Sequence, residues 1–477
     1  MSFKIVLNVL GGLLRFLGMI MVVPLLVAYY YDESLYPFIV AVAVTGFTGI
    51  ILSFKYKSDD EWKTREGFAI VAFGWLAAAA FGAIPFVFDG ITPLNAIFES
   101  MSGFTTTGAT VFVDIESHSR SILFWRSMTQ WLGGMGIIML FIAILPKLGV
   151  AGRQLFRAEA PGPTEDKLKP RIRETAKILW MVYVVISLIE VALLLLAKMS
   201  LYDAVTHTFT TMACGGFSTY ADSVKAFNSP LIEGIITLFM FIAGANFALH
   251  YKTLYVNKKI FLKDNEFKFY ATIVLFATGL LTILLWRDMD YTIFDSLRYA
   301  VFQVVSIVTT TGFATIDFNL WSDSARMVLF IVMFIGGSAG STAGGIKVVR
   351  VLLLLKYGRR ELFKSIHRKA IKPIKFNGVT VSDDVMHSIV SFVVIYLIIF
   401  IVSSGILSIL GMDMISSLTA SIATLGNIGP GFNLVGPMAN FDVVHPIGKL
   451  VLIANMWVGR LEVFTVIVML TPEFWKK

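Results

Sequence analysis

Long apolar runs alternate with short polar stretches along this chain. Each run is long enough to cross a hydrocarbon core of about 30 Å as a helix, at a rise of about 1.5 Å per residue. The expected spans are 4–30, 36–54, 66–88, 121–146, 174–198, 229–251, 266–287, 326–355, 385–410 and 446–470. The first run carries Arg15 and ends without a small-residue cleavage site, so a retained helix is expected rather than a signal peptide. The pattern predicts an all-α polytopic membrane protein with about ten transmembrane helices.

The loops between these spans alternate in charge. Lys and Arg gather in the loops 55–65, 147–173, 252–263 and 356–375, whereas the intervening loops lean acidic. Cytoplasmic loops carry the excess of basic residues in membrane proteins, so both termini are expected on the cytoplasmic side. The 356–375 loop is the most basic, and two interpretations stay open for it: a purely topological signal, or a docking surface for a cytoplasmic partner or anionic membrane lipid.

Composition narrows the classes of function. Of the 477 residues, 56% are hydrophobic and 15% charged, with a mean hydropathy of +0.77. A soluble chain has about a quarter of its residues charged, so most soluble enzymes are excluded. The formal charge of +8 does not indicate nucleic-acid binding, because the basic residues lie in loops between apolar runs. The single cysteine, Cys214, excludes a disulfide framework, and the six histidines form no metal-binding motif.

A fourfold repeat lies between alternate pairs of spans. Four segments too polar and short to cross the membrane align on a final glycine, namely 95–108, 203–216, 299–312 and 416–429. The second position of each segment is small: Ala96, Ala204, Ala300 and Ser417. Each unit is therefore expected to consist of a span, a short helix, an extended Gly/Thr strand and a second span. Four such units predict a pseudo-fourfold axis. The expected divisions are two extra helices in 1–60, then pore repeats in 61–150, 151–258, 259–375 and 376–477.

The chemistry of this unit favours a cation pore. Non-helical backbone at membrane depth requires protein or a water-filled cavity to satisfy its carbonyls. Glycine permits the positive φ values that align successive carbonyls, and a ring of such carbonyls can replace the hydration shell of a monovalent cation. None of the four Gly/Thr-rich stretches contains a carboxylate, which argues against a divalent-cation filter. The alternative, that these glycines only allow close helix packing, is disfavoured by four alignable copies.

At these stretches the chain resembles the Trk/Ktr/HKT superfamily of potassium transporters, and within it the TrkH/TrkG membrane subunits. The resemblance is carried by 105–110, 309–315 and 427–431, and the two extra N-terminal spans favour TrkH/TrkG over the superfamily's eight-span subunits. In this superfamily a serine at the first filter position accompanies Na⁺ transport in some plant members. Glycine at all four positions, Gly108, Gly216, Gly312 and Gly429, therefore implies K⁺ preference. The family's ion sites carry over to the carbonyls of Thr106, Thr107, Gly108, Cys214, Gly215, Gly216, Thr310, Thr311, Gly312, Asn427, Ile428 and Gly429. The second strand departs most, with Cys214 and Gly215 at positions that threonines occupy in the first and third strands, and little effect is expected because backbone carbonyls coordinate the ion.

A glycine-rich run interrupts the eighth span. Each glycine costs about 1 kcal/mol relative to alanine in a helix, so the run cannot hold a stable one. One interpretation is a helix-packing seam of Gly336, Gly340 and Gly344. The other, which the resemblance supports, is an intramembrane gating loop, 336–347, below the filter. The residues assigned to the gate are Gly336, Gly337, Ser338, Ala339, Gly340, Ser341, Thr342, Ala343, Gly344, Gly345, Lys347 and Arg460.

Charged and polar residues inside spans need partners. Arg460 lies mid-span, where an arginine is costly, and it resembles the family's arginine that meets the gating loop. A structural bridge to Glu462 is the alternative. Lys347 is expected to reach the cytoplasmic face, and Asn246 and His250 to be satisfied polar groups at a helix end.

These expectations describe an uptake pore for K⁺, and for Rb⁺, that catalyses no reaction and binds no organic cofactor. The resemblance implies a homodimer in the inner membrane of a prokaryote, gated by a cytosolic ring of RCK/KTN-type TrkA subunits. A nucleotide, ATP, ADP or NAD, would act only through that partner. A proton- or sodium-coupled symporter stays open, although the filter stretches offer no titratable group for coupling. An intramembrane enzyme would need a nucleophile with a base or paired carboxylates within the spans, and the sequence offers no such constellation.

Overall fold

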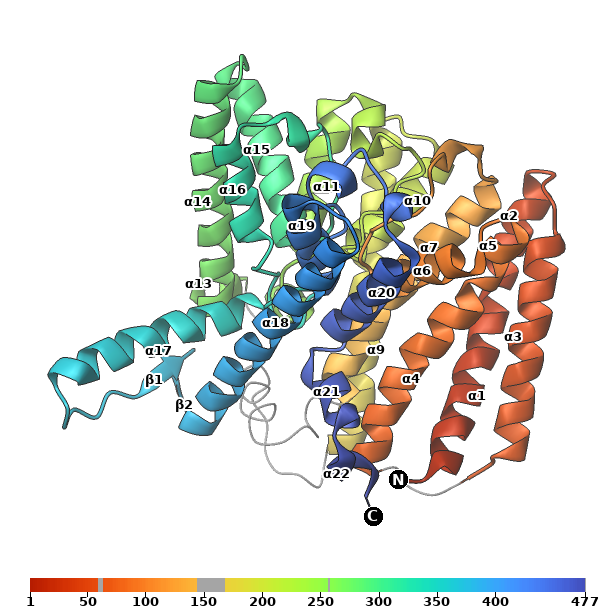
Figure 1. The fold of residues 1–477 in the computed structure, drawn as a ribbon, viewed down its shortest axis with the longest axis horizontal. Coiled ribbons are helices and arrows are strands. Elements are labelled where there is room, and N and C mark those ends of the chain that lie inside the picture. Colours follow the sequence, from red (N-terminus) through yellow and green to blue (C-terminus); the bar gives the residue numbers. More distant parts are fainter. Residues whose placement is uncertain (59–62, 144–167, 256–257, 477) are drawn as a thin grey trace.

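The computed structural model describes residues 1–58, 63–143, 168–255 and 258–476. Helices dominate this part of the chain, with one short hairpin in which β1 (Ile374–Phe376) pairs antiparallel with β2 (Val379–Val381) (Figure 1). The α-helices are α1 (Phe3–Ile20), α2 (Val22–Tyr30), α3 (Tyr36–Lys55), α4 (Thr64–Gly82), α5 (Ile84–Phe88), α6 (Pro93–Phe104), α7 (Arg120–Ala143), α9 (Leu168–Leu196), α10 (Leu201–Met212), α11 (Pro230–Ala243), α12 (Phe247–Tyr255), α13 (Ile260–Lys263), α14 (Asn265–Asp288), α15 (Ile293–Val308), α16 (Asp323–Val332), α17 (Val348–Ile366), α18 (Asp383–Ile409), α19 (Met414–Leu425), α20 (Pro446–Arg460), α21 (Phe464–Leu470) and α22 (Pro472–Trp475). Short 3₁₀ turns lie at Ile115–Ser117, Ser223–Phe227, Phe318–Leu320, Asn433–Val435 and Phe441–Val443.

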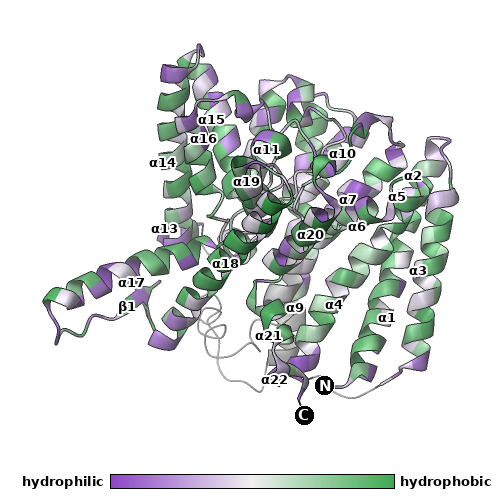
Figure 2. Ribbon diagram, viewed as in Figure 1, coloured by the Kyte–Doolittle hydropathy of each residue, from purple (hydrophilic) through white to green (hydrophobic). Residues whose placement is uncertain are grey.

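The polytopic helical fold expected from hydropathy is confirmed. Among the described residues, six helices are long and apolar enough to cross a membrane, or up to eight spans if each of two bent helix pairs counts as one. Hydrophobic residues cover the flanks of the long helices and hydrophilic ones gather near their ends (Figure 2). Large apolar side chains on these flanks are exposed, as in the 73% exposed Phe276, which is typical of a lipid-facing surface.

Two expected spans are wrong as straight helices, whereas the interruption expected in the eighth span is confirmed. The span 229–251 is bent by 97° between α11 and α12, and the span 446–470 is bent by 116° between α20 and α21. At the second bend Glu462 and Val463 both have positive φ, which a right-handed helix cannot accommodate. The span 326–355 consists of α16, the glycine-rich loop and α17. The basic loop 147–173 and the division at 150/151 fall largely outside the described residues, and the division into four pore repeats remains a prediction.

The first two spans pack closely against each other. A Cβ placed on Gly11 of α1 would come within 2.6 Å of the Ser53 nitrogen, and one on Gly49 of α3 within 2.6 Å of the Arg15 nitrogen. Small residues at such crossings let membrane helices approach backbone to backbone. This explains why α1 and α3 form a pair at one side of the fold (Figure 1).

Four short helices, α6, α10, α15 and α19, lie inside the bundle, and most of their residues are buried. Three of them begin with a side-chain cap, in which Ser200, Thr292 and Asp413 each accept a hydrogen bond from the backbone nitrogen three residues later. The fourth, α6, has Pro93 in its first turn, where a missing N–H costs no hydrogen bond. Each helix ends four residues before the glycine on which its segment was aligned.

Candidate functional site

The four turns that follow the short helices share one backbone conformation. The second residue before each glycine has positive φ, although none is glycine: Thr106 (50°), Cys214 (53°), Thr310 (56°) and Asn427 (53°). The glycines follow with φ of 84° at Gly108, 74° at Gly216, 82° at Gly312 and 104° at Gly429. Positive φ is uncommon for non-glycine residues, so four equivalent cases indicate one repeated structure.

One hydrogen bond also recurs in all four turns. The nitrogen of the residue before each glycine donates to a carbonyl of the preceding short helix, in the pairs Thr107 to Ser102 (2.8 Å), Gly215 to Thr210 (2.8 Å), Thr311 to Ser306 (2.8 Å) and Ile428 to Ala423 (2.7 Å). The turn is therefore tied to its own helix in the same way each time. Because the carbonyl ends of helices carry partial negative charge, the four helices direct that charge toward the turns.

The four turns meet in a closed circle. A Cβ placed on each glycine would collide with or crowd the carbonyl oxygen of the residue preceding the glycine of another repeat. The pairs run Gly108 to Gly215, Gly216 to Thr311, Gly312 to Ile428 and Gly429 to Thr107. The contacts pass through repeats one to four and return to the first. The twelve residues that sequence reasoning assigned to the filter are thus brought to one place.

A cavity of ≈ 80 Å³ opens onto this ring. All four glycines line it, together with residues that follow the strands, such as Ser218 and Pro430. Glycine is required at the ring for two reasons, the positive φ and the absence of room for a side chain.

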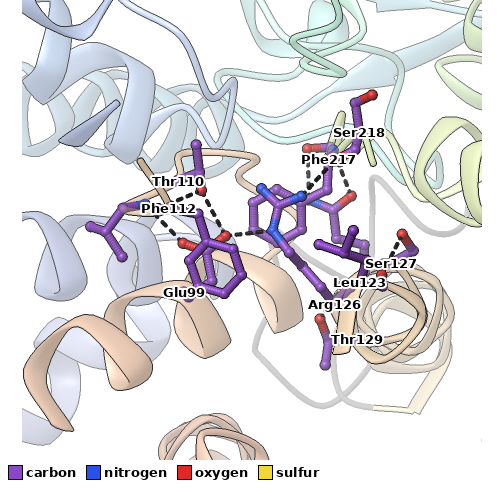
Figure 3. A network of polar contacts seen from close by, with 12 residues as sticks. Glu99, Thr110, Phe112, Leu123, Arg126, Ser127, Thr129, Phe217 and Ser218 are labelled. Carbon is purple, nitrogen blue, oxygen red and sulfur yellow. Dashed lines mark hydrogen bonds and ion pairs between the residues drawn. The ribbon is translucent and has the colours of Figure 1, made fainter. Parts of the chain in front are cut away.

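A buried ion pair between α6 and α7 connects the segments that follow the first two filter strands, and the sequence interpretation missed it (Figure 3). Arg126 Nε of α7 lies 2.6 Å from Glu99 Oε1 of α6, and both side chains are at most 2% exposed. Glu99 also accepts hydrogen bonds from the Thr110 hydroxyl and the Val111 nitrogen, whereas Arg126 donates to the Ser218 carbonyl at 2.8 Å. The pair therefore connects the segment after the first strand to the segment after the second. Arg126 could have been noticed, because it is an arginine inside the expected span 121–146.

The glycine-rich loop packs against the ends of three short helices. Residues 336–347 form no helix, so the interpretation as a helix-packing seam is wrong; Ile335 and Ile346 instead pair as a parallel bridge that closes the loop. The Gly344 nitrogen donates to the Thr310 hydroxyl at 2.6 Å, and the Thr342 hydroxyl donates to the Met212 carbonyl at 2.9 Å. A Cβ on Gly344 would collide with the carbonyl of Gly426.

Buried charges hold this loop. Arg460, 2% exposed, donates to the Thr342 carbonyl at 2.8 Å and to the Gly133 carbonyl of α7 at 3.3 Å. The alternative bridge to Glu462 is wrong, because Glu462 pairs with Arg350 of α17. The expectation that Lys347 reaches the cytoplasmic face is also wrong: its side chain is 4% exposed and donates to the Ala343 carbonyl.

Other groups around the loop have structural roles. Glu266 of α14 accepts a hydrogen bond from the Ala339 nitrogen at 2.7 Å, a contact that the sequence interpretation missed. Asn246 accepts from the Ala248 nitrogen at 2.8 Å, and His250 lies 2.9 Å from the Ile242 carbonyl, so both are satisfied as expected. Within the described ranges, no group of three or more His, Cys, Asp or Glu side chains could hold a metal ion.

Comparison with known proteins gives consistent matches over the whole chain. The sequence model of a family described as "TrkH: Cation transport protein" matches residues 37–477. The Trk system potassium uptake proteins TrkH of Salmonella typhimurium and Escherichia coli K12 are 42% and 41% identical, over all of both chains. The Trk system potassium uptake protein TrkG of Escherichia coli K12 is 33% identical over 99% of each chain. The crystal structure of the potassium transporter TrkH from Vibrio parahaemolyticus superposes with a TM-score of 0.92 at 38% identity, covering both chains entirely.

Proposed function

The chain belongs to the TrkH family of cation transport proteins, and from that premise we propose that it takes up K⁺, and Rb⁺, through the ring of four glycine strands. The closed circle of contacts between Gly108, Gly216, Gly312 and Gly429 and the neighbouring carbonyls carries this proposal. Four backbones that meet in this way can surround one dehydrated monovalent cation with carbonyl oxygens. The twelve filter residues are its proposed ligands, through their backbone carbonyls.

The loop 336–347 is the proposed gate. Its contacts with Thr310, Met212 and Gly426 seat it against the ends of the third, second and fourth short helices. The cationic side chains of Lys347 and Arg460 are buried at the same loop. Positive charge of this kind opposes the passage of a cation, so displacement of the loop is required for flux.

The resemblance also supplies the proposed assembly. A homodimer in a prokaryotic inner membrane would be regulated by a cytosolic ring of RCK/KTN-type TrkA subunits, and nucleotide would act only through that ring. Two observations support a cytoplasmic location for the termini and for the segment 356–375. Both termini lie at the same end of the molecule, and α17 with its hairpin extends away from the other helices near that end (Figure 1). The basic residues of 356–375 lie on this extension and are the proposed docking surface.

One observation favours a second candidate, a proton-coupled symporter. Glu190 of α9 is fully buried, and it lies beside Thr211 of α10, the short helix of the second repeat. A carboxyl group inside a membrane protein is a functional candidate by default. Glu190→Gln would abolish a response to a pH gradient if this group coupled proton and K⁺ movement.

Cation flux into liposomes that hold the purified chain tests these proposals. We expect K⁺ and Rb⁺ to enter in preference to Na⁺, with no response to an imposed pH gradient. Equal entry of Na⁺ and K⁺ would contradict the selective ring, whereas flux that follows the pH gradient, and loses this dependence in Glu190→Gln, would establish the symporter. Deletion of 339–345 should raise flux without changing ion preference, and unchanged flux would contradict the gate.

A further inference from the structure

We propose that Gln130 of α7 is a positioning residue for the second strand and that it determines K⁺ selectivity by holding the Gly215 carbonyl. The proposal rests on the proposed function, because it assigns the support of one ligand in the same ring. Gln130 lies outside all twelve filter residues and outside the loop 336–347.

The four strands differ in the side-chain contacts that support them. In the first strand the hydroxyls of Thr105 and Thr107 are 2.8 Å apart, and in the third strand those of Thr309 and Thr311 are also 2.8 Å apart. Each pair fixes the residue before the glycine against the end of its helix. The fourth strand has no such pair, and the buried Ile428 side chain takes that position.

The second strand has neither a threonine pair nor, before its glycine, a buried side chain such as that of Ile428. Its residues at these two positions are Ala213 and Gly215, which offer no hydroxyl and almost no side chain. An unsupported glycine is the most flexible residue a filter strand could contain. A separate support is therefore needed to hold the Gly215 carbonyl as firmly as its three counterparts.

Gln130 supplies that support. Its side chain is fully buried, and its amide nitrogen donates to the Gly215 carbonyl at 2.7 Å, while its amide oxygen accepts from the Phe217 nitrogen at 3.1 Å. These two bonds bracket Gly216 and fix the peptide groups on both sides of it. One turn earlier on the same face of α7, Arg126 donates to the Ser218 carbonyl and lies 3.6 Å from the centre of the Phe217 ring.

Gln130 also accounts for the glycine at position 215. A Cβ placed there would lie 2.4 to 2.8 Å from the three terminal atoms of the Gln130 side chain. The amide therefore occupies the space that threonine takes in the first and third strands. Gly215 and Gln130 form a matched pair, and either one restricts what the other can be.

The support has an electrostatic consequence for the ring. Among the hydrogen bonds of the described residues, the Gly215 carbonyl accepts one from a side chain, whereas the corresponding carbonyls of Thr107, Thr311 and Ile428 accept none. Ion selectivity depends on the position or the field strength of the coordinating carbonyls. Loss of the amide donor changes both at one of the four oxygens, so it should affect the preference between K⁺ and Na⁺ more than total flux.

The test compares K⁺, Rb⁺ and Na⁺ flux for the full chain in liposomes with that for Gln130→Met and Gln130→Leu, two variants of similar side-chain size that have no hydrogen-bond donor. Ser127→Ala is the matched control, since Ser127 is buried on the same helix and, among the described residues, its hydroxyl bonds only to Leu123 of that helix. We expect the K⁺/Na⁺ flux ratio to fall roughly two- to tenfold in the Gln130 variants, the factor that corresponds to one net hydrogen bond. The control should keep the wild-type ratio.

A reciprocal pair of variants separates positioning from packing. Gly215→Thr alone should lower K⁺ flux, because its side chain collides with Gln130. The double variant Gln130→Ala with Gly215→Thr should recover the wild-type K⁺/Na⁺ flux ratio, because threonine then occupies the vacated space. A folded Gln130→Met or Gln130→Leu with the wild-type K⁺/Na⁺ ratio would overturn the inference and leave the proposed function intact. A wild-type chain that passes Na⁺ as fast as K⁺ would instead overturn the proposed function, and with it this inference.

Discussion

Gly344 is the position at which a single methyl group should open the proposed gate. Its nitrogen donates at 2.6 Å to the hydroxyl of Thr310, which follows the third short helix, and its Cα faces the end of the fourth short helix. A Cβ there would collide with the Gly426 carbonyl and lie 2.9 Å from the Asn427 Cβ. Both obstacles belong to a strand that the ring holds in place, so in Gly344→Ala the loop has to move.

The size of the effect follows from the cost of overpacking. Inserting a methyl group into a well-packed site typically costs about 1–3 kcal/mol, since the obstacle is backbone and cannot rotate away. If this cost applies only to the seated loop, the ratio of seated to displaced molecules falls roughly 5- to 150-fold. We expect K⁺ flux into liposomes to rise by a comparable factor until the displaced state dominates. The K⁺/Na⁺ ratio should stay at the wild-type value because the strands are not altered.

The matched control is Gly405→Ala in α18, where a Cβ would meet no atom within 4 Å. This variant makes the same chemical change inside a helix far from the loop in sequence, so its flux should equal that of the wild type. A folded Gly344→Ala with flux at or below the wild-type value would refute the reasoning. In that case the loop either does not obstruct the pathway or accommodates the methyl group while seated.

Three further predictions concern groups around the ring and the loop. Glu99→Gln should lower the free energy of unfolding by about 3–5 kcal/mol, because it leaves the buried guanidinium of Arg126 without its counter-charge. Thermal unfolding in detergent measures this change. A double variant that also replaces Arg126 by Met should lose less free energy of unfolding than the sum of the two single changes. Thr342→Val removes the hydroxyl that donates to the second short helix and should raise resting K⁺ flux roughly two- to tenfold; a flux equal to that of the wild type would contradict a seated role for this side chain. The hydrogen bond from the Lys449 ammonium holds the pKa of Asp442 below its ordinary value of 3.8. Its contribution to stability is therefore present at neutral pH and lost as pH falls through the lowered pKa. Because the Asp442 side chain is 41% exposed, the contribution is under about 1 kcal/mol. The difference in melting temperature between the wild type and Asp442→Asn should accordingly shrink between pH 7 and pH 3.

The four similar turns were predictable because their determinants are local. The glycines of the four segments and the small residues before them are read from the sequence, and the positive φ at Gly108, Gly216, Gly312 and Gly429 follows from what only glycine tolerates. The break in the eighth span was predictable for the same reason, since glycines are crowded within 336–345. Both features depend on residues within one short stretch of chain.

The contacts that hold these features could not be predicted, because they join residues far apart in sequence. Gln130 binds a carbonyl 85 residues away, and Arg460 binds one 118 residues away. Reasoning from neighbours suggested Glu462 for Arg460, yet residues two apart on a helix do not face each other, and α20 ends at Arg460. Lys347 was misplaced in a related way, since its local sequence does not reveal that the loop buries it.

The ring therefore combines a uniform backbone with unequal supports. One pattern of positive φ and one hydrogen bond to the helix recur in all four strands, whereas the groups behind them are a threonine pair, Gln130, a second threonine pair and Ile428. In the proposed filter the backbone has to be uniform because four carbonyls would meet at one axis, but the support only has to fill the space and hold the peptide. Four equal repeats would place four equal supports around the axis, and a substitution behind any of them would then have the same effect. Because the supports differ here, substitutions at equivalent positions should differ in consequence, and the second strand, held by a side chain from another helix, should be the most sensitive to a change outside the filter itself.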